Sequence, residues 1–313
     1  MGGFGRRCQR SRVETPGASC VQNDEASRTA LLIAASLVLL HRDPKHSSLV
    51  SKTSADSYVH VLETYSSQTR LFLKIVQQGW FRPIAKLIER ITIPGILLHY
   101  ALRKKCIAGL VRSALTNGTT QVVVVGAGFD PLSLELHLNF PASEFWEIDH
   151  PATQRQKLRA LPKIGTERLH FVAIDLSATG LDREELIKRS FDPTHRTFWI
   201  AEGLLMYLRP DKISSLMTTL SSLSAPGSRV AFTFMEKRSD DRIQFDSQTK
   251  LVDWWLHKRG ESFVWGTTRD ELVEFVRPWR VIRFFDQYDL RRMESGLADE
   301  AIATGEVICL AEI

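Results

Sequence analysis

The strongest constraint on the fold is the stretch QVVVVGAGFD at residues 121–130. Four consecutive valines without polar alternation are typical of a strand that is buried on both faces, as in the middle of a parallel sheet. Gly126 and Gly128 then allow a tight turn and a close approach of a ligand, because neither residue carries a Cβ atom. The stretch therefore predicts the nucleotide-binding end of an α/β sheet, although a Gly-x-Gly pair after a strand can also be only a turn.

The next informative residue is Asp149, which ends the apolar segment EFWEID at residues 144–149. A carboxylate at this distance from the glycine turn can accept hydrogen bonds from the two hydroxyls of a ribose. The third glycine of the dinucleotide fingerprint is absent, because Pro131 stands in its place. Pro131 argues against NAD or FAD and for an adenosine ligand without a pyrophosphate, of which S-adenosylmethionine is the commonest.

Four motifs follow one another along the chain: GAGFD at 126–130, FWEIDHPATQ at 145–154 with Lys157, AIDL at 173–176 and IAEGLLMYL at 200–208. Together they resemble the successive motifs of leucine carboxyl methyltransferase-like enzymes, which are class I S-adenosylmethionine-dependent methyltransferases. The resemblance runs in order from about Asp24 to Ile313 and so covers nearly the whole chain. It implies S-adenosylmethionine as the cofactor.

The pattern along the chain predicts an α/β fold of the class I methyltransferase type, with a doubly wound, mostly parallel seven-stranded sheet. Residues 1–24 are expected to be a disordered basic tail and residues 25–118 a helical cap. Residues 119–313 would form the cofactor-binding α/β domain, with an inserted lid at about 236–276. Strands are expected near Val122, Phe145, Phe171, Phe198 and Val230 and at 281–285 and 306–311, and helices from near Pro131, Pro151, Asp182 and Pro210.

Composition narrows the functional class. The chain has 313 residues, 43% of them hydrophobic, which suffices for one large domain with a lid. The longest apolar run, residues 30–40, is too short to span a membrane, so we expect a buried cap helix there and no membrane partner. The scattered cysteines predict reduced thiols, a cytoplasmic setting and no metal site: Cys8, Cys20, Cys106 and Cys309. We also expect a monomer.

The net charge of +5 does not indicate a nucleic-acid partner. Arg6, Arg7, Arg10 and Arg12 all precede the first acid, Glu14, so the remainder of the chain is close to neutral. Aromatic residues are not interleaved with basic clusters in a stacking pattern. The basic start could be an organelle-targeting peptide, but it lacks an amphipathic apolar face, which favours a disordered tail.

Acidic side chains follow three of the predicted strands: Asp149, Asp175 and Glu202. Ligands of open α/β sheets lie outside the carboxyl ends of the strands, so these acids should meet Gly126 in one cleft. There Asp149 would bind the ribose, and Asp175 with Leu176 would contact the edge and face of the adenine.

The resemblance supports these assignments and implies two more, both at the methionine end of the cofactor. Glu202 would pair with the α-ammonium group. Arg103 matches the family arginine that precedes the first strand, and it would bind the carboxylate.

Each assignment has a structural alternative. Asp175 could cap a helix, and Glu202 could be a solvated acid after a strand. Arg103 begins the run RKK at 103–105, and such runs usually face solvent. His150 adjoins the ribose acid, yet a packing or turn role is favoured over a general base. Tyr207 could shape the acceptor pocket or pack in the core. No catalytic residue is assigned beyond these two candidates, His150 and Tyr207.

Methyl transfer from a sulfonium ion mainly requires alignment of donor and acceptor and exclusion of water. A carboxylate acceptor, with an unperturbed pKa near 4, is already ionised at neutral pH and needs no general base. We therefore predict an O-methyltransferase that acts on a carboxyl group of a small metabolite, in secondary metabolism.

The main alternative is methylation of a protein C-terminus, namely the terminal leucine of a phosphatase catalytic subunit. Protein-directed members of the family tend to have Glu-Cys-Val-Leu-Val-Tyr where this chain has EGLLMY at 202–207. The variant DHPATQ at 149–154 is seen more in small-molecule relatives, which favours a small-molecule substrate. A hydroxyl O-methyltransferase, a nicotinamide oxidoreductase and a non-catalytic cofactor-binding module are further alternatives.

Overall fold

A computed structural model describes residues 27–161, 167–238, 241–258, 262–297 and 299–313. The basic tail predicted at 1–24 lies outside these residues. The described part of the chain begins with a run of helices, as predicted: α1 (Arg28–His41), the short 3-10 helix η1 (Ser47–Leu49), α2 (Lys52–Tyr65), α3 (Ser67–Val76), α4 (Phe81–Thr92) and α5 (Ile96–Thr116).

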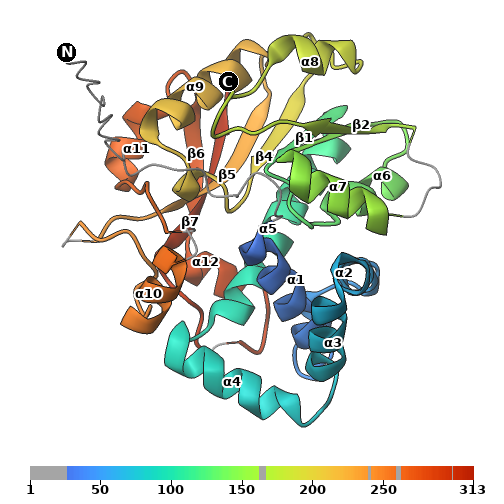
Figure 1. The fold of residues 1–313 in the computed structure, drawn as a ribbon. Coiled ribbons are helices and arrows are strands. Elements are labelled where there is room, and N and C mark those ends of the chain that lie inside the picture. The colour runs from blue at the N-terminus through green and yellow to red at the C-terminus, as the bar shows by residue number, and fades with distance from the viewer. Residues whose placement is uncertain (1–26, 162–166, 239–240, 259–261, 298) are drawn as a thin grey trace, which may run out of the picture.

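Strands and helices then alternate along the chain (Figure 1). The strands are β1 (Gln121–Val125), β2 (Glu144–Asp149), β3 (Leu169–Ala173), β4 (Thr197–Ala201), β5 (Arg229–Met235), β6 (Arg280–Phe285) and β7 (Glu306–Glu312). Their order in the sheet is β3-β2-β1-β4-β5-β7-β6, in which β7 runs antiparallel to both of its neighbours. The other pairings are parallel, which confirms the predicted doubly wound, mostly parallel sheet of seven strands.

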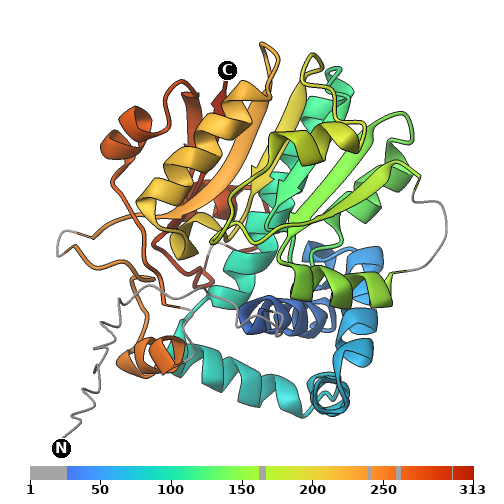
Figure 2. The ribbon, with the colours of Figure 1, turned by 45° about the horizontal axis from the view of Figure 1, so that its top comes forward.

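Helices cover both faces of this sheet (Figures 1 and 2). They are α6 (Leu132–Asn139), α7 (Pro151–Ala160), α8 (Arg183–Lys188), α9 (Pro210–Ser222), α11 (Arg269–Phe275) and α12 (Gln287–Arg292). The 3-10 helix η2 (Leu205–Tyr207) follows β4, and α10 (Lys250–Lys258) lies away from the sheet, near α4 (Figures 1 and 2). Local signals set several starts. Pro151 and Pro210 occupy the first turns of α7 and α9, and the Asp182 side chain caps α8 by accepting from the Glu184 N–H.

The valine run explains why the sheet has two cores. Val122 and Val124 point into a cluster with α5, α6 and α12, whereas Val123 and Val125 point into a cluster with α8, α9 and α11. All four side chains are buried. A strand in this position must be apolar on both faces, which is what the unbroken run predicted.

Helix α5 belongs to two layers at once. The fully buried Leu102 and Ile107 lie in one cluster with Leu37 of α1 and Ile200 of β4. The helix that the sequence assigned to the cap therefore also covers the sheet. Likewise α11, in the predicted insert, places Leu272 in the core beside the sheet, whereas α10 lies away from the sheet (Figure 1).

We expect Leu102→Ala to lower the free energy of unfolding by about 2–5 kcal/mol, because it opens a cavity where the cap meets the sheet. Urea denaturation followed by circular dichroism measures this loss. Leu138→Ala is the control, since Leu138 is 62% exposed on α6 and its truncation should change stability by less than about 0.5 kcal/mol. Equal losses of unfolding free energy in the two variants would contradict the role of α5 in packing the cap against the sheet.

Candidate functional site

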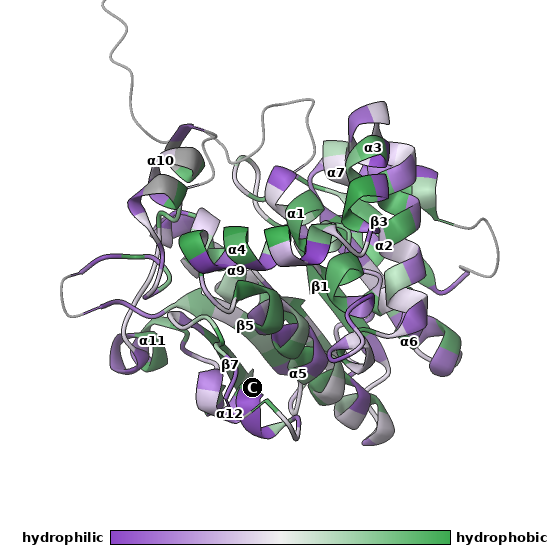
Figure 3. Ribbon diagram, turned by 90° about the horizontal axis from the view of Figure 1, so that it is seen from below, coloured by the Kyte–Doolittle hydropathy of each residue, from purple (hydrophilic) through white to green (hydrophobic). Residues whose placement is uncertain are grey.

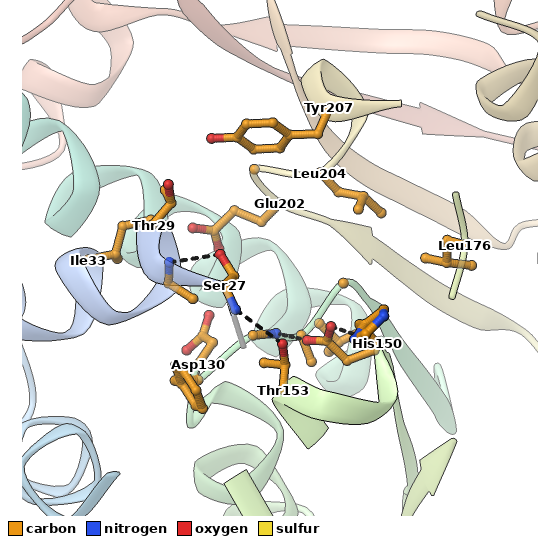
Figure 4. Close-up of a pocket in the computed structure, with 18 of the residues that line it drawn as sticks. Ser27, Thr29, Ile33, Asp130, His150, Thr153, Leu176, Glu202, Leu204 and Tyr207 are labelled. Carbon is orange, nitrogen blue, oxygen red and sulfur yellow. Dashed lines mark hydrogen bonds between the residues drawn. The ribbon is translucent and has the colours of Figure 1, made fainter. Parts of the chain in front are cut away.

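A pocket opens at the carboxyl ends of β1, β2, β3 and β4, beside the N-terminus of α1 (Figure 4). This is where the strand order reverses between β1 and β4, the position at which open α/β sheets bind ligands. The structure brings every residue singled out from the sequence to the wall of this pocket: Arg103, Gly126, Gly128, Asp149, His150, Asp175, Leu176, Glu202 and Tyr207.

The floor of the pocket is the glycine turn after β1. Gly126 and Gly128 have φ angles of 73° and 54°, in the left-handed region that residues with a Cβ atom rarely adopt. A Cβ atom on Gly126 would also lie 3.0 Å from Leu204 Cδ1. The turn is held by the Gly126 N–H, which donates to the carbonyl of Ile148 at 2.8 Å. The glycines are therefore required by the turn itself.

The Asp149 carboxylate lies beside this turn. It accepts hydrogen bonds from the Gly128 N–H and, at 2.6 Å, from the His150 N–H. Burial outweighs these donors and raises the pKa of Asp149 to about 6. A partly buried carboxylate with a raised pKa would be stabilised by further donors, and two ribose hydroxyls would supply them.

Asp175 and His150 form the adjoining wall. Asp175 Oδ1 accepts from the Ser177 N–H at 3.0 Å, the Ser177 hydroxyl at 2.6 Å and the Ala178 N–H at 3.2 Å. Burial alone would raise the pKa of Asp175, but these hydrogen bonds hold that pKa below its usual value. Asp175 thus caps a turn rather than the helix that its structural alternative predicted, and it also faces the pocket.

His150 caps helix α7. Its Nδ1 atom accepts from the Ala152 N–H at 3.2 Å, so the neutral ring carries its proton on Nε2, which lies 3.8 Å from Asp175 Oδ2. The Nδ1 atom is therefore occupied by the helix cap, while Nε2 faces the Asp175 carboxylate beyond hydrogen-bond distance. This geometry agrees with a turn role for His150.

Arg103 does not face solvent. It is 3% exposed, and its Nε and Nη2 atoms lie 2.9 and 2.8 Å from Glu202 Oε1. Its Nη1 atom donates to Glu306 Oε2 at 2.6 Å. Burial disfavours the charged guanidinium, but Glu306 and Glu202 outweigh it and raise the pKa of Arg103. The two residues assigned to opposite charges of a methionine group are thus paired with each other.

Sequence reasoning missed Lys104 and Asp130. Lys104 Nζ lies 2.6 Å from Asp130 Oδ2 and 3.1 Å from Glu202 Oε1, and the Tyr58 hydroxyl donates to Asp130 Oδ1 at 3.3 Å. Asp130 ends the GAGFD motif and Lys104 follows Arg103, so position in the motifs could have indicated both. Nothing in the sequence indicated Ser27, Thr29, Ala30 and Ile33, which line the pocket from the start of α1.

The charges of the lining residues favour a cationic ligand. The wall carries four carboxylates, of Asp130, Asp149, Asp175 and Glu202, against the two bases Arg103 and Lys104. S-adenosylmethionine carries one net positive charge, because its sulfonium adds to a zwitterionic amino acid. Over the described ranges no cluster of His, Cys, Asp or Glu side chains has the geometry of a metal site.

The family model described as leucine carboxyl methyltransferase matches residues 26–221. The chain belongs to the leucine carboxyl methyltransferase family. The resemblance read from the four motifs is thereby confirmed.

Two mycobacterial relatives carry the name "Putative S-adenosyl-L-methionine-dependent methyltransferase". The protein of Mycobacterium sp. (strain KMS) is 39% identical over 177 residues, which cover 53% of this chain and 58% of that protein. The protein of Mycobacterium tuberculosis (strain ATCC 25177 / H37Ra) is 31% identical over 214 residues, which cover 61% and 64%. The chain thus matches less than two thirds of the length of these relatives. Their names contain the cofactor that the sequence predicts.

Two solved structures share the fold. A "putative methyltransferase" from Thermobifida fusca YX has a TM-score of 0.58 at 14% identity and covers 96% of this chain and 99% of its own. A DUF574 family protein from Streptomyces avermitilis MA-4680 has a TM-score of 0.54 at 15% identity and covers 80% and 99%. At these identities the likeness concerns the fold alone.

Glu306 does not line the pocket itself but holds Arg103, which does. It begins β7, is 2% exposed and accepts from Arg103 Nη1, while His99 Nε2 lies 2.8 Å from the same carboxylate oxygen. Burial would raise its pKa, but Arg103 and His99 lower the pKa of Glu306 to about 2. Removal of this charge would leave the Arg103 guanidinium with one fewer buried counterion.

Glu306→Gln should lower the free energy of unfolding at pH 7 by about 3–5 kcal/mol, because it breaks a buried ion pair. The folded-state pKa is depressed, so the charge stabilises the protein above pH 4.5 and the benefit is lost as pH falls toward 2. Denaturation with urea at pH 7 and pH 3 measures both effects.

The matched control is Glu312→Gln on the same strand, since Glu312 pairs with the more exposed Arg229 and Arg280. Its loss should stay below about 1 kcal/mol. A loss in Glu306→Gln no larger than in this control would remove Glu306 from the support of Arg103.

Proposed function

We propose that the chain binds S-adenosylmethionine in this pocket and transfers its methyl group to an acceptor. When bound, the cofactor supplies a methyl group that is already activated on a sulfonium sulfur. The observation that carries the proposal is the Asp149 carboxylate, placed at the glycine turn with a pKa raised to about 6. Asp149 would accept hydrogen bonds from the ribose. Asp175 and Leu176 would contact the adenine.

The methionine end would meet the ion-pair cluster of Arg103, Lys104 and Glu202. The bases can attract the carboxylate and Glu202 the α-ammonium group. Because Arg103 is also held by Glu306, it is positioned before the ligand arrives, which limits the entropy lost on binding.

Cofactor binding should weaken as pH falls through about 6, because the ligand needs the ionised form of Asp149. If ribose donors return the pKa toward its ordinary value near 4, affinity at pH 5 should be about tenfold lower than at pH 7. In the protein without ligand, the free energy of unfolding should fall as pH rises through 6, because the folded state then has to ionise a buried Asp149 whose pKa is raised. Isothermal titration calorimetry across pH 5–7 measures the trend.

The control is Asp149→Asn, which retains the shape of the side chain but does not titrate. Its affinity should be lower by about 1–3 kcal/mol and flat between pH 5 and 7. A wild-type affinity that does not change with pH, or an unimpaired variant, would show that Asp149 does not contact the ligand.

For the acceptor we propose a carboxyl group of a small metabolite. The proposal is supported by the contacts that the possible general bases in the pocket already make. Asp130 and Glu202 are paired with Lys104, Asp149 accepts from two N–H groups, and His150 caps α7. A hydroxyl acceptor normally needs a positioned base, whereas a carboxylate does not. The acceptor would enter between Tyr207 of η2 and Thr29 and Ile33 of α1, which face one another in Figure 4.

The name of the family favours a second candidate, methylation of a leucine carboxyl group. The departure of residues 202–207 from the protein-directed motif argues against a protein C-terminus. A cytoplasmic monomer with a role in secondary metabolism stays a prediction.

The protein is incubated with cell extract and methyl-labelled S-adenosylmethionine. We expect label in the small-molecule fraction, and mild alkali should release this label as methanol. An ester is cleaved under these conditions and a methyl ether is not. Alkali-labile label in the protein fraction would favour the C-terminal candidate instead. Cofactor binding without label in either fraction would indicate a non-catalytic module.

His150→Ala should reduce turnover only a few-fold and lower stability by about 1 kcal/mol, through loss of the α7 cap. Initial rates at saturating cofactor, together with thermal unfolding, measure both. A loss of about a hundredfold or more, combined with an alkali-stable product, would make His150 a general base and the acceptor a hydroxyl.

A further inference from the structure

Helix α4 lies along the edge of the molecule farthest from the sheet (Figures 1 and 2). Arg82, Lys86, Glu89 and Arg90 all line a cavity between α4 and the rest of the cap. Glu89 Oε1 accepts from the Leu97 N–H at 3.0 Å, and Lys86 Nζ lies 3.2 Å from Asp43 Oδ2. This arrangement inverts the usual amphipathic helix, which turns its apolar side inward.

The opposite side of α4 is apolar and exposed. Ile84, Leu87, Ile88 and Ile91 recur at the spacing of one helix face, and all four count among the exposed large hydrophobic residues. Leu87 is 59% exposed. We call these four residues the α4 face.

Aromatic residues extend the α4 face toward α3. Trp80, just before α4, is 60% exposed and meets Phe81 edge-on at 6.0 Å between ring centroids. Phe81 in turn meets Phe72 of α3 at 6.4 Å. Leu71 and Phe72 are exposed as well, so one apolar surface continues over both helices. Figure 3 views the molecule from this side and shows hydrophobic segments along α4.

The charges around this surface are almost all positive. Residues 67–92 contain five bases and one acid, Glu89, which gives a net charge of 5 − 1 = +4. Of these bases, Lys86 alone forms an ion pair with a carboxylate within the described part of the chain. The bases are Arg70, Lys74, Arg82, Lys86 and Arg90.

We propose that the α4 face, with Trp80, Leu71 and Phe72, binds an anionic lipid surface. An apolar helix face with a tryptophan at its end and bases at its sides is the pattern of helices that lie in the interface of a bilayer. Apolar side chains would enter the acyl boundary, and the exposed bases Arg70, Lys74 and Arg90 would reach the lipid phosphates. Arg82 is half-buried in the cavity and Lys86 is paired with Asp43, so these two bases would contribute less. Electrostatic attraction between each base near the surface and the anionic lipids adds to the binding free energy.

The charge of residues 67–92 favours an anionic bilayer over a second copy of the chain as the partner of the α4 face. A symmetric dimer through the α4 face would bring two surfaces of net charge +4 against each other, whereas an anionic bilayer is complementary. Among the described helices none is long and apolar enough to cross a membrane. The expectation of no membrane partner rested on that criterion, which does not concern a helix lying in the surface.

The test is co-sedimentation of the full chain with vesicles of phosphatidylcholine that contain about one-third phosphatidylserine, against vesicles of phosphatidylcholine alone. Leu87→Asp should reduce partitioning into the anionic vesicles about tenfold or more, because the bilayer loses a buried leucine. Leu138→Asp on α6 is the control, since it adds the same charge at an equally exposed leucine, and it should leave partitioning unchanged. Thermal unfolding checks that both variants are folded.

Preference for the anionic vesicles, weakened by high salt and by Leu87→Asp alone, would support the proposal. Absence of binding to either vesicle would overturn it. Binding that Leu87→Asp leaves intact would place the contact elsewhere, as on the arginines before Glu14. A dimer that Leu87→Asp dissociates in sedimentation velocity would make the occupant a second copy. None of these readouts depends on methyl transfer, so they are independent of the proposed activity.

Discussion

The buried guanidinium of Arg103 joins the helical cap to the sheet and to the pocket. It ties helix α5 to Glu202 after β4 and to Glu306 at the start of β7, three segments that are far apart in the sequence. A charge that is almost fully buried is tolerated only with such partners, so loss of one carboxylate would strain both the core and the pocket. The same Glu202 also faces the pocket, which links the stability of the fold to the charge that a ligand meets.

Helix α5 extends this link to the cap. Leu102 packs with α1 and with the sheet, while the neighbouring Arg103 and Lys104 line the pocket. The start of α1 covers the pocket, and the Ser27 N–H lies 3.4 Å from Thr153 Oγ1 of α7. The cap is therefore part of the site, and residues that select an acceptor would come from it.

The surface of the cap differs from the pocket in charge and polarity. The pocket is recessed and has an excess of carboxylates, whereas the surface of α3 and α4 is apolar and basic. The excess of carboxylates suits a cationic cofactor, and the basic surface suits anionic lipid head groups. The pocket and the segment of α3 and α4 thus differ in the sign of their excess charge.

The sheet and the glycine turn could be predicted from local sequence patterns, and the family from the order of four motifs. Val122–Val125, Gly126 and Pro151 act through local rules of burial, backbone conformation and helix capping, which any short window reveals. The burial of Arg103 against Glu306 could not be predicted in this way, because their separation of 203 residues leaves no local signal. The tertiary structure also decided which side of α4 faces inward. Periodicity defines two faces of a helix, but the partner that each face meets is set by packing.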